Sequence, residues 1–268
     1  MTESQPRIGF TADLCSRPLI YGIEHHEGPA NAGLFIESTA VATQRLLNNE
    51  CAAALIGPID YARNSSDFSL YGSASISSRD DSRAIVLCMK RDIRKIATVA
   101  IGSVSSSDIV LTKIVLSEKF EQEITVVPFI GAVDEMLSKA DAALLCGDAV
   151  LTSGWNGPKL DIVDEWTDMT ELPFVHLVCA SRKEHHKDEI EHLLRISQER
   201  GISSLDQVAA SALSALAVPA EVVEAQLERY SYGFHPDTRE GLSEFLRYAF
   251  YHGIIPDVPE LDIAGNEG

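Results

Sequence analysis

Short runs of Val, Ile, Leu and Ala alternate with segments of helical periodicity over the first two thirds of the chain. Continuous apolar runs are typical of strands buried on both faces, and a strand followed by a helix is the repeating unit of a parallel sheet. The pattern therefore predicts an α/β fold, a mainly parallel sheet with helices on both faces. The predicted strands are Arg7–Thr11, Leu34–Ile36, Ala52–Ile56, Ala84–Met89, Thr98–Ile101, Ile124–Val127, Ala142–Leu145 and Phe174–Ala180.

The predicted helices fall into two groups. Those of the first group follow strands closely, whereas those of the last third follow one another without strands between them, which predicts a helical carboxy-terminal segment. Ser105 and Asp237 are suitable caps for two of these helices. The helices are Arg17–Glu24, Ser38–Asn48, Ser105–Glu118 and Val133–Lys139, then Lys187–Arg200, Ser204–Leu216, Ala220–Tyr230 and Asp237–His252.

The order of these elements favours two lobes. Residues 94–182 hold enough strands and helices for a small second lobe, entered after the strand ending near Met89 and left by the strand ending near Ala180. Residues 1–93 and 183–268 then form the first lobe, which includes the carboxy-terminal helices. Two crossings make a hinge, and small ligands usually bind in the cleft between two lobes.

The charge of the chain limits its partners. Forty acidic residues against 22 basic residues give a formal net charge of −18, which repels a phosphate backbone and argues against nucleic acid. The first residues, MTESQPRIGF, lack the basic region and apolar run of a signal peptide, and no segment reaches the ~18 apolar residues of a membrane span. We therefore expect a cytoplasmic protein with no membrane partner, and the sequence does not indicate its oligomeric state.

Small polar residues follow three of the predicted strands, at 13–17, 102–108 and 147–148. In the segment GSVSSSD, Ser103, Ser105 and Ser107 offer hydroxyls and the N–H groups of a helix start, which together suit a carboxylate; a Ser105 that only caps its helix is the equal alternative. Arg17 has the chemistry to pair with a ligand carboxylate or to remain solvated. Asp148 either caps the following helix or faces the cleft.

The remaining titratable residues predict neither a metal site nor a cofactor. The five cysteines are widely spaced without a CxxC pair, and no nucleotide-binding or hydrolase motif occurs in a fitting context. His176 lies inside an apolar strand, where a core histidine is favoured over a catalytic base. The residue pattern alone thus predicts an anion-binding cleft.

Six blocks carry a resemblance to a known family and cover nearly the whole chain in the family's order. They are RIGFTADLCSRPLIYGIE, AALIGPIDYARN, AIGSVSSSDIVLTKIVLSEKF, ADAALLCGDAVL, DEWTDMTELPFVHLV and GLSEFLRYAFYHGIIP. On these blocks the chain resembles the chorismate dehydratases of the futalosine route to menaquinone. The resemblance implies a two-lobed periplasmic-binding-protein-like (type II) fold with a helical carboxy-terminal segment.

The resemblance also implies a reaction and a set of site residues. It implies a cofactor-free lyase that removes water from chorismate, a small anionic substrate, to give 3-[(1-carboxyvinyl)oxy]benzoate. Cys15 and Asp148 stand at the expected catalytic positions. The expected substrate-binding positions are Asp13, Ser16, Arg17, Ala84, Ser103, Ser105, Ser107 and Gly147.

The chain departs from the family pattern at several of these positions. Cys15 stands where the family has an Asn thought important for catalysis, Ala84 where it has a Ser, and Gly57 where a Ser or Thr is common; residues 80–82 replace a Gly-Pro-Val segment. An amide has thus become a weakly bonding thiol. Two alternatives follow: a non-catalytic protein that binds or senses a small acid, or an enzyme with a new substrate in which Cys15 or Asp13 transfers the proton.

A reactive thiol at position 15 is one version of the second alternative. A thiolate requires a lowered pKa, and the expected helix start and the nearby Arg17 are the two features of the sequence that favour one.

Overall fold

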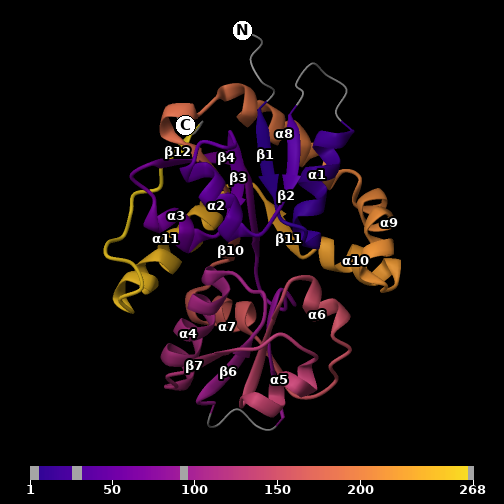
Figure 1. Cartoon of the computed structure of the whole chain (residues 1–268), viewed down its shortest axis with the longest axis vertical. Helices are drawn as coiled ribbons and strands as arrows, with labels where there is room; N and C mark the ends of the chain where they lie inside the picture. Colours follow the sequence, from indigo (N-terminus) through magenta and orange to yellow (C-terminus); the bar gives the residue numbers. More distant parts are fainter. Residues whose placement is uncertain (1–5, 26–31, 91–95, 265–268) are drawn as a thin grey trace.

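The computed structural model describes residues 6–25, 32–90 and 96–264, and these form two lobes, each built on its own β-sheet (Figure 1). The two sheets lie one above the other in the view of Figure 1, with helices on their flanks. Within the described residues, no helix is both long and apolar enough to cross a membrane.

The sheet of the first lobe has seven strands among the described residues, in the order β11-β4-β10-β3-β1-β2, with β12 paired to β4. Strands β1, β2 and β3 are parallel, whereas β10 runs antiparallel to both β3 and β4. The strands are β1 (Arg7–Phe10), β2 (Gly33–Ile36), β3 (Ala53–Ile56), β4 (Phe68–Ser78), β10 (Phe174–Arg182), β11 (Tyr230–Tyr232) and β12 (Ile263–Ala264).

In the part of the second lobe that the structure describes, the sheet has five strands in the order β7-β6-β8-β5-β9. Strand β6 is parallel to β7 and β8, whereas β5 is antiparallel to β8 and β9. The strands are β5 (Ile85–Met89), β6 (Thr98–Ile101), β7 (Thr125–Pro128), β8 (Ala142–Cys146) and β9 (Lys159–Asp161). Helices α4 (Ser106–Phe120), α5 (Val133–Lys139), α6 (Asp148–Thr152) and α7 (Ile162–Thr170) belong to this lobe.

The first lobe carries the amino-terminal and carboxy-terminal helices. All eight predicted helices are present, with ends within three residues of the expected ones, except that Asp237 lies inside the last helix and His235 takes the cap position. The helices and 3-10 turns are η1 (Leu14–Ser16), α1 (Arg17–Glu24), α2 (Thr39–Leu47), α3 (Pro58–Arg63), η2 (Lys183–His185), α8 (Asp188–Ile202), α9 (Leu205–Leu216), α10 (Ala220–Leu227) and α11 (Pro236–Tyr251).

Helices α1 and α8 cross at two glycines. A Cβ atom on Gly22 of α1 would lie 2.0 Å from the carbonyl oxygen of Ser197, and one on Gly201 of α8 would lie 2.0 Å from the carbonyl oxygen of Pro18. The Ser197 hydroxyl also donates to the carbonyl oxygen of Leu19. The backbones of the two helices are therefore in contact. This contact fixes the position of α1, the helix that follows η1 in the chain.

Three features of the fold differ from the sequence predictions. Both sheets are mixed rather than mainly parallel. The expected boundary after residue 93 lies outside the described residues, but strand pairing assigns β5 to the second sheet and β10 to the first. The crossings therefore lie at residues 79–84 and 171–173, about ten residues before the expected boundaries, because an apolar strand buried on both faces does not reveal which sheet it joins.

Four strands, β4, β9, β11 and β12, were not predicted. The longest, β4, has the sequence FSLYGSASISS, in which Ser and Gly interrupt the apolar pattern. Its residues are nonetheless mostly buried, since β4 pairs with β10, β11 and β12.

Candidate active site

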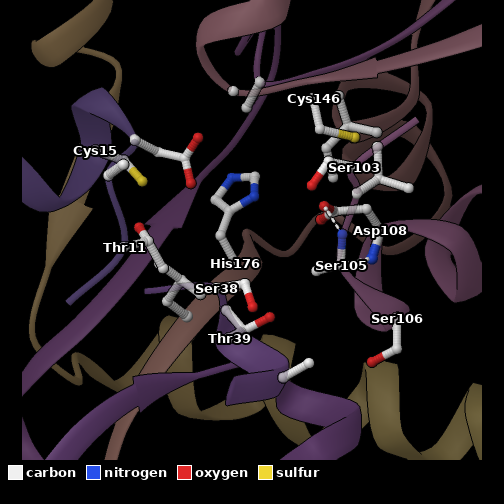
Figure 2. A pocket seen from close by; sticks show the side chains of 18 of the residues that line it. Thr11, Cys15, Ser38, Thr39, Ser103, Ser105, Ser106, Asp108, Cys146 and His176 are labelled. Atoms are coloured by element: carbon white, nitrogen blue, oxygen red, sulfur yellow. Dashed lines mark hydrogen bonds between the residues drawn. The ribbon is translucent and has the colours of Figure 1, made fainter. Parts of the chain in front are cut away.

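A cavity of about 630 Å³ opens between the lobes, at the carboxyl ends of strands from both sheets (Figure 2). The first lobe contributes the ends of β1 and β2 and the start of α2, and the second contributes the ends of β6 and β8 and the start of α4. The lining residues are Thr11, Ala12, Asp13, Cys15, Ile36, Glu37, Ser38, Thr39, Ala40, Asp60, Ala84, Ile85, Ser103, Val104, Ser105, Ser106, Asp108, Cys146, Gly147, His176, Leu177 and Tyr230.

Six of the ten residues singled out from the sequence line this cavity. They are Asp13, Cys15, Ala84, Ser103, Ser105 and Gly147. The other four do not line it: Ser16, Arg17, Ser107 and Asp148. Ser16 is buried, with its hydroxyl 2.7 Å from that of Thr11. Arg17 is half-buried at the start of α1; burial raises the pKa of Asp148, and the charge of Arg17 partly opposes that shift.

Asp148 and Ser107 join the two lobes rather than facing the cavity. The Asp148 Oδ1 accepts a hydrogen bond from the backbone N–H of Leu14 at 2.8 Å, so this second-lobe carboxylate caps η1 of the first lobe. Ser107 is fully buried, and its Oγ accepts from the N–H of Ile59 at 3.1 Å. Both side chains were expected to contact substrate; in the structure each is occupied by the backbone of the opposite lobe.

Ser107 takes the place of a missing cap on α3. Gly57 is the N-cap residue of α3 and has no side chain to accept from Ile59, two positions further on. A Cβ on Gly57 would lie 2.8 Å from the Ser107 Oγ. The first lobe therefore receives from the second the acceptor that a Ser or Thr at position 57 would supply itself. A neighbouring contact, from the Ser106 hydroxyl to the Asp60 carboxylate at 3.3 Å, joins the lobes at the same edge.

Cys15 lines the cavity but carries a neutral thiol. It is 8% exposed, and its pKa is raised well above the ordinary value by burial and by the carboxylates of Asp13 and Asp148. The lowered thiol pKa considered from the sequence is therefore wrong, because the thiol is buried beside carboxylates. The Cys15 carbonyl oxygen accepts from the Tyr232 hydroxyl at 3.0 Å, which holds this wall in place.

His176 projects into the cavity from β10, where a core position was favoured. It lies between Cys15 and Asp108 in Figure 2. Its Nε2 lies 2.6 Å from the Ser78 Oγ, and burial lowers the pKa of its ring to about 3. The imidazole is neutral at physiological pH. No pattern in the sequence distinguished this cavity position from a core position, since the neighbouring residues of β10 are all buried and apolar.

Asp108 is the main site residue that sequence reasoning missed. It is the third residue of α4, in a capping box: the Ser105 N–H donates to the Asp108 Oδ2 at 3.2 Å, and the Asp108 N–H donates to the Ser105 Oγ at 3.1 Å. Burial raises the pKa of Asp108 to about 6, and Asp13 contributes to the same shift. The signal in the sequence was Ser105 followed by an acid three residues later, which is typical of a cap.

The cavity wall combines carboxylates with helix starts. Lys and Arg are absent from the lining residues within the described part of the chain, whereas Asp13, Glu37, Asp60 and Asp108 all belong to it. Donors for an anion come from hydroxyls and from the first turns of α2 and α4, whose N–H groups have no partner within the helix. No cluster of three or more His, Cys, Asp or Glu side chains suited to a metal ion occurs among the residues described.

Comparisons with known proteins agree with this architecture. Residues 6–251 match a protein family described as menaquinone biosynthesis. A chorismate dehydratase of Thermus thermophilus is 24% identical over 217 residues, which cover 75% of this chain and 80% of the relative.

Two solved structures are similar in fold. A protein of Archaeoglobus fulgidus superposes with a TM-score of 0.77 at 19% identity, over 94% of this chain and all of the other. The periplasmic aliphatic sulphonate binding protein of Escherichia coli gives a TM-score of 0.68 at 14% identity, over 96% and 89% of the two chains. The two-lobed fold expected from the sequence is thus confirmed as that of the periplasmic binding proteins.

Proposed function

The chain belongs to the menaquinone biosynthesis family, and from that premise we propose that it is a lyase that removes water from chorismate, or from a closely related carboxylate, in the cavity between its lobes. The observation that carries the proposal is this cavity of about 630 Å³, whose walls come from strand ends of both lobes. Its volume is in the range that suits a small organic ligand. The Thermus thermophilus relative, a chorismate dehydratase, supports the choice of substrate.

The wall has groups for a ligand with carboxylates. Ser38 and Thr39 at the start of α2 and Ser103, Ser105 and Ser106 before and within the start of α4 offer hydroxyls from opposite lobes. Helix starts attract anions without a formally charged side chain. A ligand with two carboxylates can therefore bridge the lobes, and contacts to both would favour the closed arrangement.

The chemistry asked of the site is modest. Water leaves from a ring hydroxyl and a proton leaves from the adjacent ring carbon that carries the ether oxygen, after which the ring is aromatic. The product is 3-[(1-carboxyvinyl)oxy]benzoate. Because aromatisation favours the reaction, the protein has to orient the ring and supply one proton donor and one acceptor.

A second function, binding without turnover, is supported by two lining residues. Cys15 and Ala84 stand where the resemblance gives an Asn and a Ser, so two polar groups of the family's wall are missing from this cavity. A protein that binds or senses a small aromatic or dicarboxylic acid needs the cavity but not these groups.

One experiment separates the two functions. Chorismate is incubated with the protein at neutral pH and followed by proton NMR, with a protein-free sample to measure spontaneous decay. Appearance of 3-[(1-carboxyvinyl)oxy]benzoate supports the lyase. Unchanged chorismate together with a raised melting temperature overturns the lyase and supports the binding protein. Ser103→Trp, which fills the cavity from an exposed lining position, should abolish both signals.

A further inference from the structure

Two carboxyl groups face the cavity from opposite lobes. Asp13 follows β1 of the first lobe and is the N-cap residue of η1, and Asp108 lies in the first turn of α4 of the second lobe. The charge of Asp13 contributes, after burial, to the raised pKa of Asp108. Two carboxyls in one site whose environments differ are a common arrangement for an acid and a base.

Asp108 is the carboxyl that holds a proton more firmly. Burial is the largest cause of its pKa of about 6, and only the Ser105 groups and the Cys146 thiol stabilise its charged form. In Figure 2 the Cys146 sulfur lies near Asp108 on the same side of the cavity. A bound anion would raise the pKa of Asp108 further, because like charges disfavour its carboxylate.

Asp13 is the carboxyl on the first-lobe side, and its charged form has a hydrogen-bond donor. Burial raises its pKa, and Thr11, which donates a hydrogen bond to the carboxylate, opposes that shift. Gly147 of the second lobe makes room for it: a Cβ on Gly147 would lie 2.9 Å from the Asp13 Oδ1. This glycine also has a φ of +56°, so any side chain here would both strain the backbone and displace Asp13.

The other titratable groups around the cavity are held neutral, paired with a cation or bonded between the lobes. Burial keeps the thiols of Cys15 and Cys146 and the ring of His176 neutral. Glu37 is held as a carboxylate by Arg45, at 2.5 and 2.7 Å. Burial also raises the pKa of Asp60, and its carboxylate accepts from the Ser106 hydroxyl at the contact between the lobes. No Lys or Arg among the described residues lines the cavity to hold Asp108 ionised.

Building on the proposed function, we propose that Asp108 and Asp13, one from each lobe, are the acid and the base of this site. The Asp13 carboxylate takes the proton from the ring carbon that carries the ether, and the electron pair of that C–H bond forms the new ring double bond. The C–O bond to the neighbouring hydroxyl breaks, and that hydroxyl takes the proton of Asp108 and leaves as water. Transfer of one proton from Asp13 to Asp108 then restores the starting state, so no oxidant or other reactant is needed.

This assignment gives the chain a proton route that does not use an amide at position 15. The two carboxyls approach a ligand only when the lobes are closed, because they belong to different lobes. The contacts of Asp148 with Leu14 and of Ser107 with Ile59 hold that arrangement.

The first test is the pH dependence of kcat/KM for chorismate. Asp108→Asn keeps an acceptor for the Ser105 N–H but has no proton to give, so it should lower kcat by about a hundredfold or more and remove the alkaline limb of the profile. Asp13→Asn should lower kcat similarly and remove the acidic limb. Retention of the wild-type rate and of both limbs by Asp108→Asn would overturn the assignment.

The matched control is Asp161→Asn. Asp161 also has a pKa raised to about 6 by burial and caps a helix, α7, but it does not line the cavity. Its substitution should leave the pH profile unchanged. If the effect of Asp108→Asn came only from the loss of a buried capping carboxyl, Asp108→Asn and Asp161→Asn would change the rate and the pH profile alike. That result would also argue against the assignment.

A second readout separates this assignment from the proposed function. Calorimetric titration of 3-hydroxybenzoate at pH 7, in two buffers of different ionisation enthalpy, measures the protons taken up on binding. Uptake by the wild type and its loss in Asp108→Asn support the proton-holding role even if chorismate is not consumed, in which case only the lyase fails. Absence of uptake by the wild type overturns the role of Asp108 whether or not chorismate is consumed.

Discussion

At the scale of single residues, the site depends on which groups keep a proton. Cys15 occupies the position where the resemblance gives a catalytic amide, yet burial and two carboxylates keep its thiol neutral. A neutral buried thiol is a poor nucleophile and a weak donor. Its carbonyl oxygen, which accepts from Tyr232, is its better-defined contact. We infer that the side chain of Cys15 shapes the wall of the cavity.

Substitutions at Cys15 should therefore have small effects on turnover. Cys15→Ala is expected to lower the rate of chorismate consumption less than about tenfold, in contrast to the loss expected for Asp108→Asn. Cys15→Asn should retain or raise the rate, since an amide adds a donor and an acceptor. NMR detection of the aromatic ether compares the variants. A loss of a hundredfold in Cys15→Ala, with unchanged ligand binding, would contradict this interpretation.

At the scale of secondary structure, the lobes meet through helix caps that cross between them. The start of α3 in the first lobe is capped by Ser107 from α4 of the second lobe, and η1 is capped by Asp148 from α6. These contacts lie at two separate edges of the interface. Opening of the cleft would leave the N–H groups of Ile59 and Leu14 without these acceptors.

The pair at positions 57 and 107 allows a direct test of the shared cap. Ser107→Ala removes the acceptor and should cost about 0.5–2 kcal/mol of unfolding free energy. Gly57→Ser crowds the Ser107 Oγ and should also destabilise. In the double variant Gly57→Ser/Ser107→Ala, the crowding is relieved and the serine introduced at position 57 can cap α3. Its loss of unfolding free energy should therefore be smaller than the sum of the losses of the two single variants. Urea unfolding measures all four proteins, and simple additivity would show that the two positions are independent.

Helices and apolar strands were accessible from the sequence, whereas pairings between distant segments were not. The cap at Ser105 and the periodicity of α4 are local and could be predicted. Strand β4, with its interior Ser residues, is buried only because three partners surround it. Asp108 and Asp148 both stand in the first turn of a helix; the resemblance placed Asp148 at a catalytic position, whereas Asp108 is the one that lines the cavity. Which of them faces the cavity depends on how the two lobes pack together, and this cannot be read from any local segment of the sequence.

At the scale of the whole molecule, the two lobes share one apolar core near the crossings. Trp166 of α7 is fully buried and makes edge-on contacts with Phe174 of β10 and with Phe245 and Tyr248 of α11. Buried groups along β10 therefore influence the stability of both lobes. His176 is one of them, two residues from Phe174, and its ring cannot take a proton without a cost in folding free energy.

The global stability should accordingly fall on acidification through His176. Its pKa is about 3 in the folded protein and about 6.5 when unfolded, so between these values the unfolded chain binds one more proton, and stability is lost as the pH falls. His176→Gln should reduce this dependence by about 1.4 kcal/mol per pH unit between pH 4 and 6 relative to wild type.

Comparison with wild type removes the opposite contributions of Asp108 and Asp161, whose raised pKa values favour proton uptake by the folded protein. Urea unfolding at several pH values measures the slopes. The control is His192→Gln, at an exposed position, which should leave the slope of unfolding free energy against pH as in the wild type. Equal slopes in the wild type and His176→Gln would show that His176 does not contribute to the acid destabilisation.

The crossing of α1 and α8 bears on how such a site can change over evolutionary time. Gly22 and Gly201 leave no room for even a methyl group, and α1 begins immediately after η1, which carries Cys15. A lineage can replace the residue at position 15 in a single step and thereby explore new chemistry. The same lineage cannot add a side chain at either crossing glycine without tilting the helix that carries the cavity wall. Residues of the cavity wall can therefore change and alter the chemistry of the site. The position of the wall depends on Gly22 and Gly201, two residues that do not line the cavity.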